Sequence, residues 1–213
     1  MKSLLENDLL IHKGRKADHK VCLFVFSNQK HIGDPVACHQ CPPFFRRNCQ
    51  GKVFIIDTHT PVNMIGYEEY VDRVFAGAHH QCCDLILYDN DKIAFVDMTC
   101  SDESLLQPHY RKGEIVEGKR AKCRSQIQDS LDLLYTVPSI ASYIDAKTIK
   151  RAILAYRTKD ITPFDEIEIE ENLSKSEKAW LSMIQEFEKR YLKTPMEHGF
   201  TYQSIKYPTS YQW

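Results

Sequence analysis

Residues 84 to 101, Asp84-Leu-Ile-Leu-Tyr-Asp-Asn-Asp-Lys-Ile-Ala-Phe-Val-Asp97-Met-Thr-Cys-Ser101, have the pattern of a β-hairpin. Two strand-forming runs, 84–88 and 92–99, flank the turn sequence Asp-Asn-Asp at 89–91. In an antiparallel hairpin with this turn, Asp84 and Asp97 lie roughly opposite each other, near the same end of the two strands. The hairpin therefore decides which acidic side chains can meet.

Two carboxylates in this arrangement could hold a hard divalent cation. Because side chains alternate along a strand, Phe95, Asp97 and Thr99 share one face of the second strand. Anions held close together repel each other, and a cation is the usual compensation. Mg²⁺ takes one or two protein carboxylates and completes its shell with water and phosphate, which suits phosphodiester hydrolysis. The alternative is that Asp84 is a turn residue and Asp97 a solvated carboxylate at a sheet edge.

Helices and a further strand are expected around the hairpin. Residues 63–76 are predicted to form a helix with an apolar stripe that begins at Met64. Residues 118–135 are predicted to form a second helix, and residues 150–156 a strand covered on both faces. The predicted order is helix, β-hairpin, helix, strand, in an α/β fold.

The flanking regions divide the chain into three parts. We expect an N-terminal β element that contains cysteines over residues 1–61, an α/β core over 62–160, and a C-terminal helix and tail over 161–213. Strands are predicted at 20–27 and 52–57 and a helix at 174–192. The tail that follows this helix has no clear period, and its aromatic side chains are expected to pack back onto the core.

The hairpin resembles the signature of the PD-(D/E)XK, or restriction-endonuclease-like, nucleases, and the resemblance covers roughly residues 62–156. It implies that Asp84 and Asp97 are the two metal-binding acids and that the peptide carbonyl of Met98 completes the metal shell. Members often add a Glu from the preceding helix, and Glu68 fits this role better than Glu69. The resemblance implies Mg²⁺ or Mn²⁺ as cofactor and nucleic acid as substrate, with DNA more expected than RNA.

The sequence departs from the family where its lysine is expected. Thr99 occupies that position, and threonine cannot supply the positive charge that stabilises the transition state. Some members take this lysine from a neighbouring element, and the predicted helix at 118–135 begins with a strongly basic run that offers Lys119 and Lys122. Gln126 lies on the same side of this helix and could orient water or the nucleic-acid backbone. Lys92 is at the far end of the hairpin and is a poor candidate.

A second metal site is suggested by Cys38-His39-Gln40-Cys41 and Cys49. The spacing gives a C-x₂-C pair and a third thiolate, which could hold a structural Zn²⁺ with a fourth ligand from elsewhere. The alternative is that these residues are ordinary thiols, because eight cysteines in a reducing compartment need not bind metal or form disulfides.

Composition limits the classes of function. The 28 basic residues nearly balance the 29 acidic ones among 213 residues, which excludes a globally basic nucleic-acid coat but allows a local basic face. No apolar run approaches the roughly 20 residues needed to cross a bilayer. The first residues lack the apolar core of a signal peptide. We therefore expect a cytoplasmic protein without a membrane partner, and a homodimer remains open.

Three functions are consistent with these patterns. The first is a Mg²⁺- or Mn²⁺-dependent nuclease that acts through the hairpin acids. The second is a nuclease-like fold without activity that binds nucleic acid or serves in an assembly, which the threonine at position 99 favours. The third is a zinc-stapled interaction protein in which residues 22–49 carry the function.

Overall fold

A mixed six-stranded sheet forms the centre of the computed structural model, which describes residues 1–15, 19–33, 52–75, 81–101, 106, 109–111, 114–158 and 193–213. Its strands, in spatial order, are β1 (Leu23–Phe26), β4 (Val62–Gly66), β5 (Leu85–Tyr88), β6 (Lys92–Ser101), β9 (Ile149–Thr158) and β10 (Thr201–Lys206). Neighbours from β1 to β6 are antiparallel, whereas β6, β9 and β10 run parallel. The protein is thus a mixed α/β structure.

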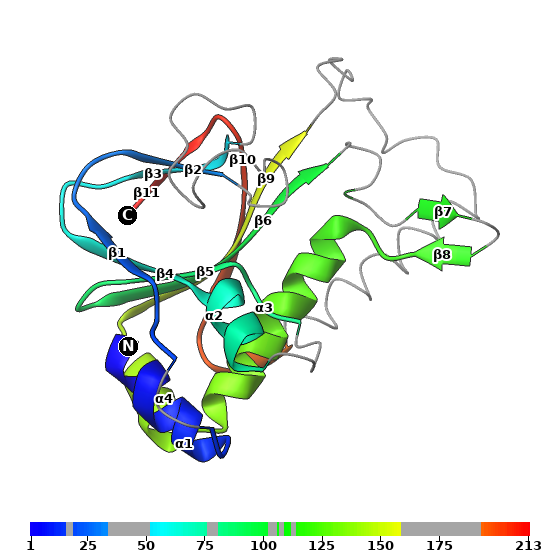
Figure 1. The fold of residues 1–213 in the computed structure, drawn as a ribbon. Helices are drawn as coiled ribbons and strands as arrows, with labels where there is room; N and C mark the ends of the chain where they lie inside the picture. The colour runs from blue at the N-terminus through cyan, green and yellow to red at the C-terminus, as the bar shows by residue number, and fades with distance from the viewer. Residues whose placement is uncertain are drawn as a thin grey trace.

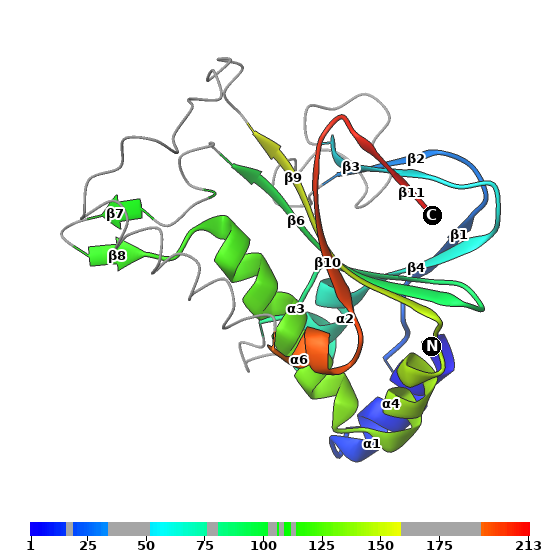
Figure 2. The same ribbon diagram turned by 180° about the vertical axis from the view of Figure 1, so that it is seen from behind.

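Different layers cover the two faces of this sheet (Figure 1). On one face lie the helices, namely the π-helix η1 (Leu4–Leu9), α1 (Leu10–His12), α2 (Tyr67–Val74), α3 (Lys119–Tyr135), α4 (Pro138–Asp145) and α6 (Lys193–Glu197). On the other face lies a three-stranded sheet, ordered β11 (Ser210–Gln212), β3 (Lys52–Asp57) and β2 (Lys30–Gly33). Figure 2 shows the same three layers from behind, with α3 across the sheet and β10 at its edge.

Strand β6 separates the two hydrophobic cores. Phe95 belongs to the core beneath the helices, whereas Val96 and Met98 belong to the core between the two sheets. Side chains on a strand alternate between its faces, so Asp97 and Thr99 lie on the helix side with Phe95. This alternation agrees with the sequence-based prediction.

The predicted hairpin is present. Leu85 pairs with Val96 and Tyr88 pairs with Ile93, so β5 and β6 enclose a short turn. The Asp89 carboxylate stabilises this turn by accepting hydrogen bonds from the N–H groups of Asp91 at 2.8 Å and Lys92 at 2.7 Å. The turn forms as predicted because an aspartate at its first position can bond to the backbone that follows.

The predicted helix at 63–76 is wrong in its first four residues. Residues 63–66 belong to β4, and α2 begins only at Tyr67. Met64 and Ile65 enter opposite cores, because β4 is paired on both edges, with β1 and with β5. Pairing on two edges and burial on two faces prevail over the helical spacing of the apolar residues.

Other predictions agree with the structure. The helix at 118–135 is α3, and the strands at 52–57 and 150–156 correspond to β3 and to the middle of β9. Phe200 and Tyr211 are buried, so aromatic side chains of the tail do pack onto the core; Phe200 directly precedes β10, and Tyr211 lies in β11, strands that were not predicted. The helix expected at 174–192 lies outside the described residues.

Several elements were not predicted, among them the two-stranded ribbon of β7 (His109–Arg111) and β8 (Glu114–Val116). Helix α4 was not predicted either; Pro138 is its first residue, where its missing N–H leaves no hydrogen bond unmade. Within the described ranges, no helix has the length and apolar character to span a membrane.

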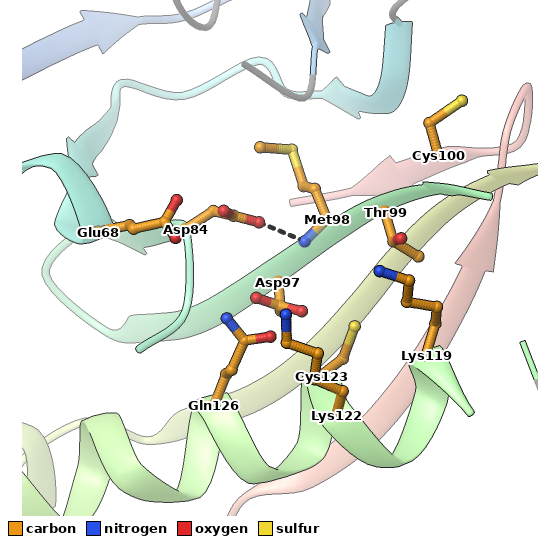
Figure 3. Close-up of a pocket in the computed structure, with 10 residues that line it drawn as sticks. All are labelled: Glu68, Asp84, Asp97, Met98, Thr99, Cys100, Lys119, Lys122, Cys123 and Gln126. Carbon is orange, nitrogen blue, oxygen red and sulfur yellow. Dashed lines mark hydrogen bonds between the residues drawn. The ribbon is translucent and has the colours of Figure 1, made fainter. Parts of the chain in front are cut away.

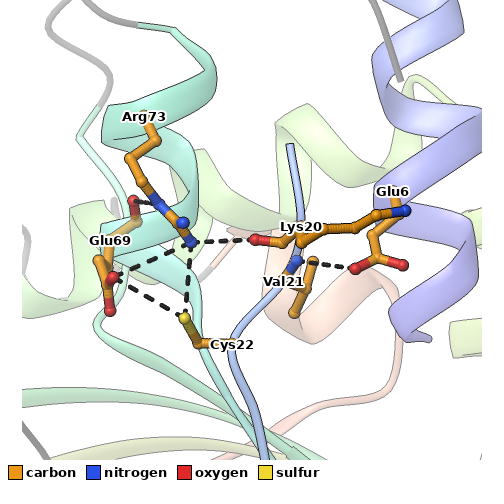
Figure 4. A network of polar contacts seen from close by, with 6 residues as sticks. All are labelled: Glu6, Lys20, Val21, Cys22, Glu69 and Arg73. Carbon is orange, nitrogen blue, oxygen red and sulfur yellow. Dashed lines mark hydrogen bonds and ion pairs between the residues drawn. The ribbon is translucent and has the colours of Figure 1, made fainter. Parts of the chain in front are cut away.

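A polar network joins η1 and α2 through the chain segment at residues 20–22 (Figure 4). The Glu6 carboxylate accepts hydrogen bonds from the Val21 N–H at 2.8 Å and from Lys2 Nζ at 2.7 Å. On the other side of that segment, Arg73 of α2 donates to the Lys20 carbonyl at 3.0 Å and lies 3.9 Å from the Glu69 carboxylate. These contacts fix α2, the helix whose first turn carries Glu68.

Candidate functional site

A pocket lies between the first turn of α2, the start of β5, the end of β6 and the first half of α3 (Figure 3). It is lined by Glu68, Asp84, Asp97, Met98, Thr99, Cys100, Lys119, Lys122, Cys123 and Gln126. The residues predicted as the nuclease site therefore come together from four elements. The cavity of about 200 Å³ has room for a cation with water or phosphate oxygens.

Asp84 connects the elements that surround the pocket. Its carboxylate accepts a hydrogen bond from the Met98 N–H at 2.5 Å, beyond the last β5–β6 pair at Leu85 and Val96. Its main-chain carbonyl accepts from the N–H groups of Tyr67 at 2.8 Å and Glu68 at 3.3 Å, the first residues of α2. Asp84 thus contacts both β6, the strand that carries Asp97, and α2, the helix that carries Glu68.

The Met98 carbonyl lies on the same edge of β6. In a β-strand the N–H and C=O groups of one residue point to the same side, and the Met98 N–H points to Asp84. The carbonyl is therefore on the Asp84 side of β6, as the resemblance requires for a ligand of the same ion. The Met98 side chain packs instead into the core between the two sheets.

The acidic side chains are buried close together. Asp84 is 9% exposed and Asp97 is 3% exposed. Burial raises the pKa of Asp84 well above its ordinary value, and the nearby Asp97 and Glu68 carboxylates raise it further, while the Met98 N–H opposes the shift. Neither acid is the solvated edge carboxylate of the alternative interpretation. Negative charge gathered in a poorly hydrated site is compensated either by protonation of one acid or by a bound cation.

Helix α3 covers the acids with a thiol and two lysines. Cys123 is 2% exposed, and burial followed by the proximity of Asp97 raises the pKa of its thiol. In Figure 3, Lys119 extends toward Thr99 and Lys122 extends toward Asp97. Lys92 lies elsewhere, 5.8 Å from the ring centroid of Trp213.

Gln126 contacts the protein backbone. Its Nε2 donates to the Cys82 carbonyl at 3.0 Å, two residues before Asp84. Ser130, one turn further along α3, accepts from the Cys83 N–H at 2.8 Å and donates to the Gln126 carbonyl at 2.7 Å. Together they attach α3 to the segment that leads into β5. Ser130 was missed because a serine in a helix has no spacing that distinguishes it.

Glu68 and Glu69 point in different directions. Glu68 lines the pocket, whereas Glu69 pairs with Arg73 and lies near the Cys22 thiol, 3.8 Å from its sulfur. Adjacent residues on a helix are 100° apart, so the two side chains cannot face the same site. Of the two glutamates, it is therefore Glu68 that lines the pocket.

The donor set fits a hydrated hard cation better than a closed protein cage. Across the described part of the chain, no group of three or more His, Cys, Asp or Glu side chains is arranged to hold a metal by itself. Mg²⁺ and Mn²⁺ need fewer protein ligands, because water and phosphate oxygens fill the rest of an octahedral shell. The zinc candidates Cys38, Cys41 and Cys49 lie outside the described residues.

Comparison with protein-family models, with curated proteins and with solved structures gave no match. What the pocket does must therefore follow from its own residues. They provide buried carboxylates on one side and two lysines on the other.

Proposed function

We propose that the chain is a Mg²⁺- or Mn²⁺-dependent nuclease with a restriction-endonuclease-like core, and that DNA is its substrate. The observation that carries this proposal is that Asp84 and Asp97, from neighbouring strands, line one pocket with Lys119 and Lys122. A bound phosphodiester needs both a cation and fixed positive side chains around its oxygens.

The arrangement of elements supports the proposed core. Helix α2 precedes the β5–β6 hairpin, α3 follows it, and β9 then pairs parallel with β6. This is the predicted order of helix, hairpin, helix and strand. The strand β4, which lies before α2 and beside β5, extends the sheet without changing that order.

Asp84, Asp97 and the Met98 carbonyl would hold the cation together with water or phosphate oxygens, and Glu68 would assist from the first turn of α2. When bound there, a divalent cation would supply Lewis-acid polarisation of the scissile phosphate and a lowered pKa for the attacking water. The chain's own contribution is to keep these oxygens buried and fixed, through the Asp84–Met98 hydrogen bond and the attachment of α2 to the Asp84 carbonyl. A site positioned in this way loses little free energy to reorganisation when substrate binds.

Lys119 and Lys122 would supply the charge that Thr99 cannot. Both extend from α3 into the pocket, and Lys119 extends toward Thr99 itself. Their ammonium groups would stabilise the negative charge that develops on the phosphate oxygens. Gln126, whose amide nitrogen is bound to Cys82, would act by fixing α3 beside the acids.

A nuclease-like binding protein without activity is the second candidate. Thr99 is the observation that favours it, because its hydroxyl stands where the family has lysine. In this case nucleic acid would bind through the lysines of α3, and no bond would be broken. The two candidates share one fold and differ in a single measurable property.

Incubation of the purified protein with supercoiled plasmid and with single-stranded DNA in Mn²⁺ or Mg²⁺ tests the proposal. We expect cleavage that EDTA abolishes and that Asp97→Asn reduces at least about 10²-fold. DNA binding without cleavage, unchanged in Asp97→Asn, supports the inactive binding protein. Absence of both binding and cleavage, with RNA as well as DNA, rejects both.

A further inference from the structure

The four cations in the first two turns of α3 do not form one solvated basic face. Lys119 and Lys122 line the pocket. Arg120 and Arg124 point to the other side of the helix, toward tyrosines of the central sheet. In the sequence these cations form one basic run, and the structure divides it into two pairs with different surroundings.

Arg124 is a buried cation stacked on an aromatic ring. It is 7% exposed, and its guanidinium carbon lies 4.5 Å from the ring centroid of Tyr202. Tyr202 belongs to β10, the outermost strand of the six-stranded sheet beyond β9. A guanidinium over an aromatic face is attracted by the ring, and the attraction is stronger when the pair is shielded from water.

Arg120 makes the equivalent contact with the next strand. Its guanidinium carbon lies 5.4 Å from the ring centroid of Tyr156 on β9. The Tyr156 ring is buried in a small cluster with Cys123 and Leu154, and Tyr202 packs against that cluster. The two stacks are separated by one helical turn and fall on neighbouring parallel strands, so they fasten α3 at two points.

The two halves of α3 are anchored differently. The second half packs through Ile127, Leu131 and Leu134, which belong to the large core beneath the helices. In the first half, the buried side chains are the small Ala121 and Cys123 together with Arg124. Few apolar contacts therefore hold the half that carries the pocket lysines.

The start of α3 also lacks a strong cap. Gly118 is its N-cap residue and provides no side-chain hydrogen bond to the first turn. The Arg120 N–H instead donates to the Leu106 carbonyl at 3.1 Å. Glycine is tolerated at an N-cap at little cost in stability, so this hydrogen bond adds to a weak cap and does not replace a missing one.

We infer that Tyr202 and Tyr156 are positioning residues that, through Arg124 and Arg120, hold the first half of α3 so that Lys119 and Lys122 stay directed at the carboxylates. This inference rests on the proposed function for its effect on catalysis. Its structural part, the anchoring of residues 119–124, does not depend on what the pocket binds. Lysine cannot replace arginine in such a stack, because only the planar guanidinium lies flat on the ring.

Three variants test the stacks. Tyr202→Phe keeps the ring and removes the hydroxyl, Tyr202→Leu removes the ring, and Arg124→Lys keeps the charge and removes the planar group. Tyr143→Leu is a control, because it removes a different cation–π contact: Tyr143 belongs to α4, Lys147 Nζ lies 4.2 Å from its ring centroid, and neither residue lines the pocket. All are measured by amide hydrogen exchange with mass spectrometry and by DNA cleavage in Mn²⁺.

We expect Tyr202→Leu and Arg124→Lys to accelerate exchange over residues 119–124 about tenfold while residues 127–135 keep wild-type protection. In both variants kcat should fall about tenfold and KM should change less than twofold. Tyr202→Phe should have a smaller effect than Tyr202→Leu, because it keeps the ring and loses only the hydroxyl, which bonds to Arg124 and Ser204. Tyr143→Leu should lower the melting temperature without faster exchange at 119–124.

Two results would overturn the inference. One is equal exchange at 119–124 in Tyr202→Leu and in wild-type protein. The other is a uniform rise across the whole chain that Tyr202→Phe shares, which marks general destabilisation. If wild-type protein cleaves no nucleic acid but the exchange pattern is as expected, the proposed function fails and the anchoring stands.

Discussion

The Asp84 carboxylate accepts the hydrogen bond from the Met98 N–H, in the place of a backbone carbonyl from a neighbouring strand. Strand β5 begins only at Leu85, and the Asp84 side chain continues its hydrogen bonding along β6 at 2.5 Å. The acid is therefore both part of the sheet and part of the pocket. Its substitution should affect the two roles to different extents, which makes the site testable without any assay of activity.

Cation binding should stabilise the folded protein through these acids. Binding at about 100 times Kd contributes about 2.7 kcal/mol, which corresponds to a rise in melting temperature of about 5–10 °C for a chain of this size. We expect this rise with Mn²⁺ in wild-type protein and its loss in Asp84→Asn, because asparagine can still accept from the Met98 N–H but brings no charge. Differential scanning fluorimetry measures it, and an equal rise in the variant would show that the cation binds elsewhere.

The two adjacent glutamates of α2 provide a matched pair. Glu68 lines the pocket, whereas Glu69 pairs with Arg73. Glu68→Gln should weaken Mn²⁺ binding about tenfold, and Glu69→Gln should leave it unchanged, because only the first removes a charge next to Asp84. Isothermal titration calorimetry gives both affinities. Equal affinities in the two variants would remove Glu68 from the ligand set.

A lysine introduced on β6 should compensate for the loss of a pocket lysine on α3. Lys119→Gln and Lys122→Gln should each lower kcat on DNA, and the larger loss should reach about 10²-fold. Adding Thr99→Lys to the more impaired variant should restore part of the rate, because position 99 faces the same pocket. Lys92→Gln, near Trp213, is the control and should cleave at the wild-type rate. A double variant no faster than the single one would contradict this prediction.

The Glu6 carboxylate should make stability depend on pH. Burial alone would raise its pKa, but hydrogen bonds from Lys2 and from the Val21 N–H lower the pKa below the ordinary value. A lowered folded-state pKa stabilises the fold above the unfolded pKa, near 4.3, and this contribution is lost as pH falls through the folded value. Urea unfolding of wild-type and Glu6→Gln protein between pH 7 and pH 3 should show a smaller fall in stability for the variant. Parallel curves would exclude Glu6 as a source of the dependence.

The hairpin and the helix α3 could be predicted because their signals are local. A turn of Asp-Asn-Asp and a strict alternation place Asp97 and Thr99 on one face without knowledge of the rest of the fold. The basic spacing of α3 likewise placed the lysines and Gln126 on one side. All of these residues line the pocket.

Other features depend on contacts between distant segments, and the sequence alone could not reveal them. β4 is a strand because β1 and β5 pair with it, although its residues have helical spacing. β10 pairs with β9 across more than 40 residues of chain. The division of the basic run depends on Tyr202, which lies far along the chain from Arg124. No local pattern distinguishes a stacked arginine from a solvated one.

The alternation along β6 also limits how this protein can change during evolution. Phe95 supports the helices and Asp97 opens into the pocket, while Val96 and Met98 fill the space between the sheets. Deleting one residue between the turn and Asp97 would turn the acid into the inter-sheet core and expose Met98 in its place. A substitution in this strand can have a small or a large effect on the fold, whereas an insertion or deletion moves every residue after it to the opposite face. We therefore expect natural insertions to fall in the 89–91 turn.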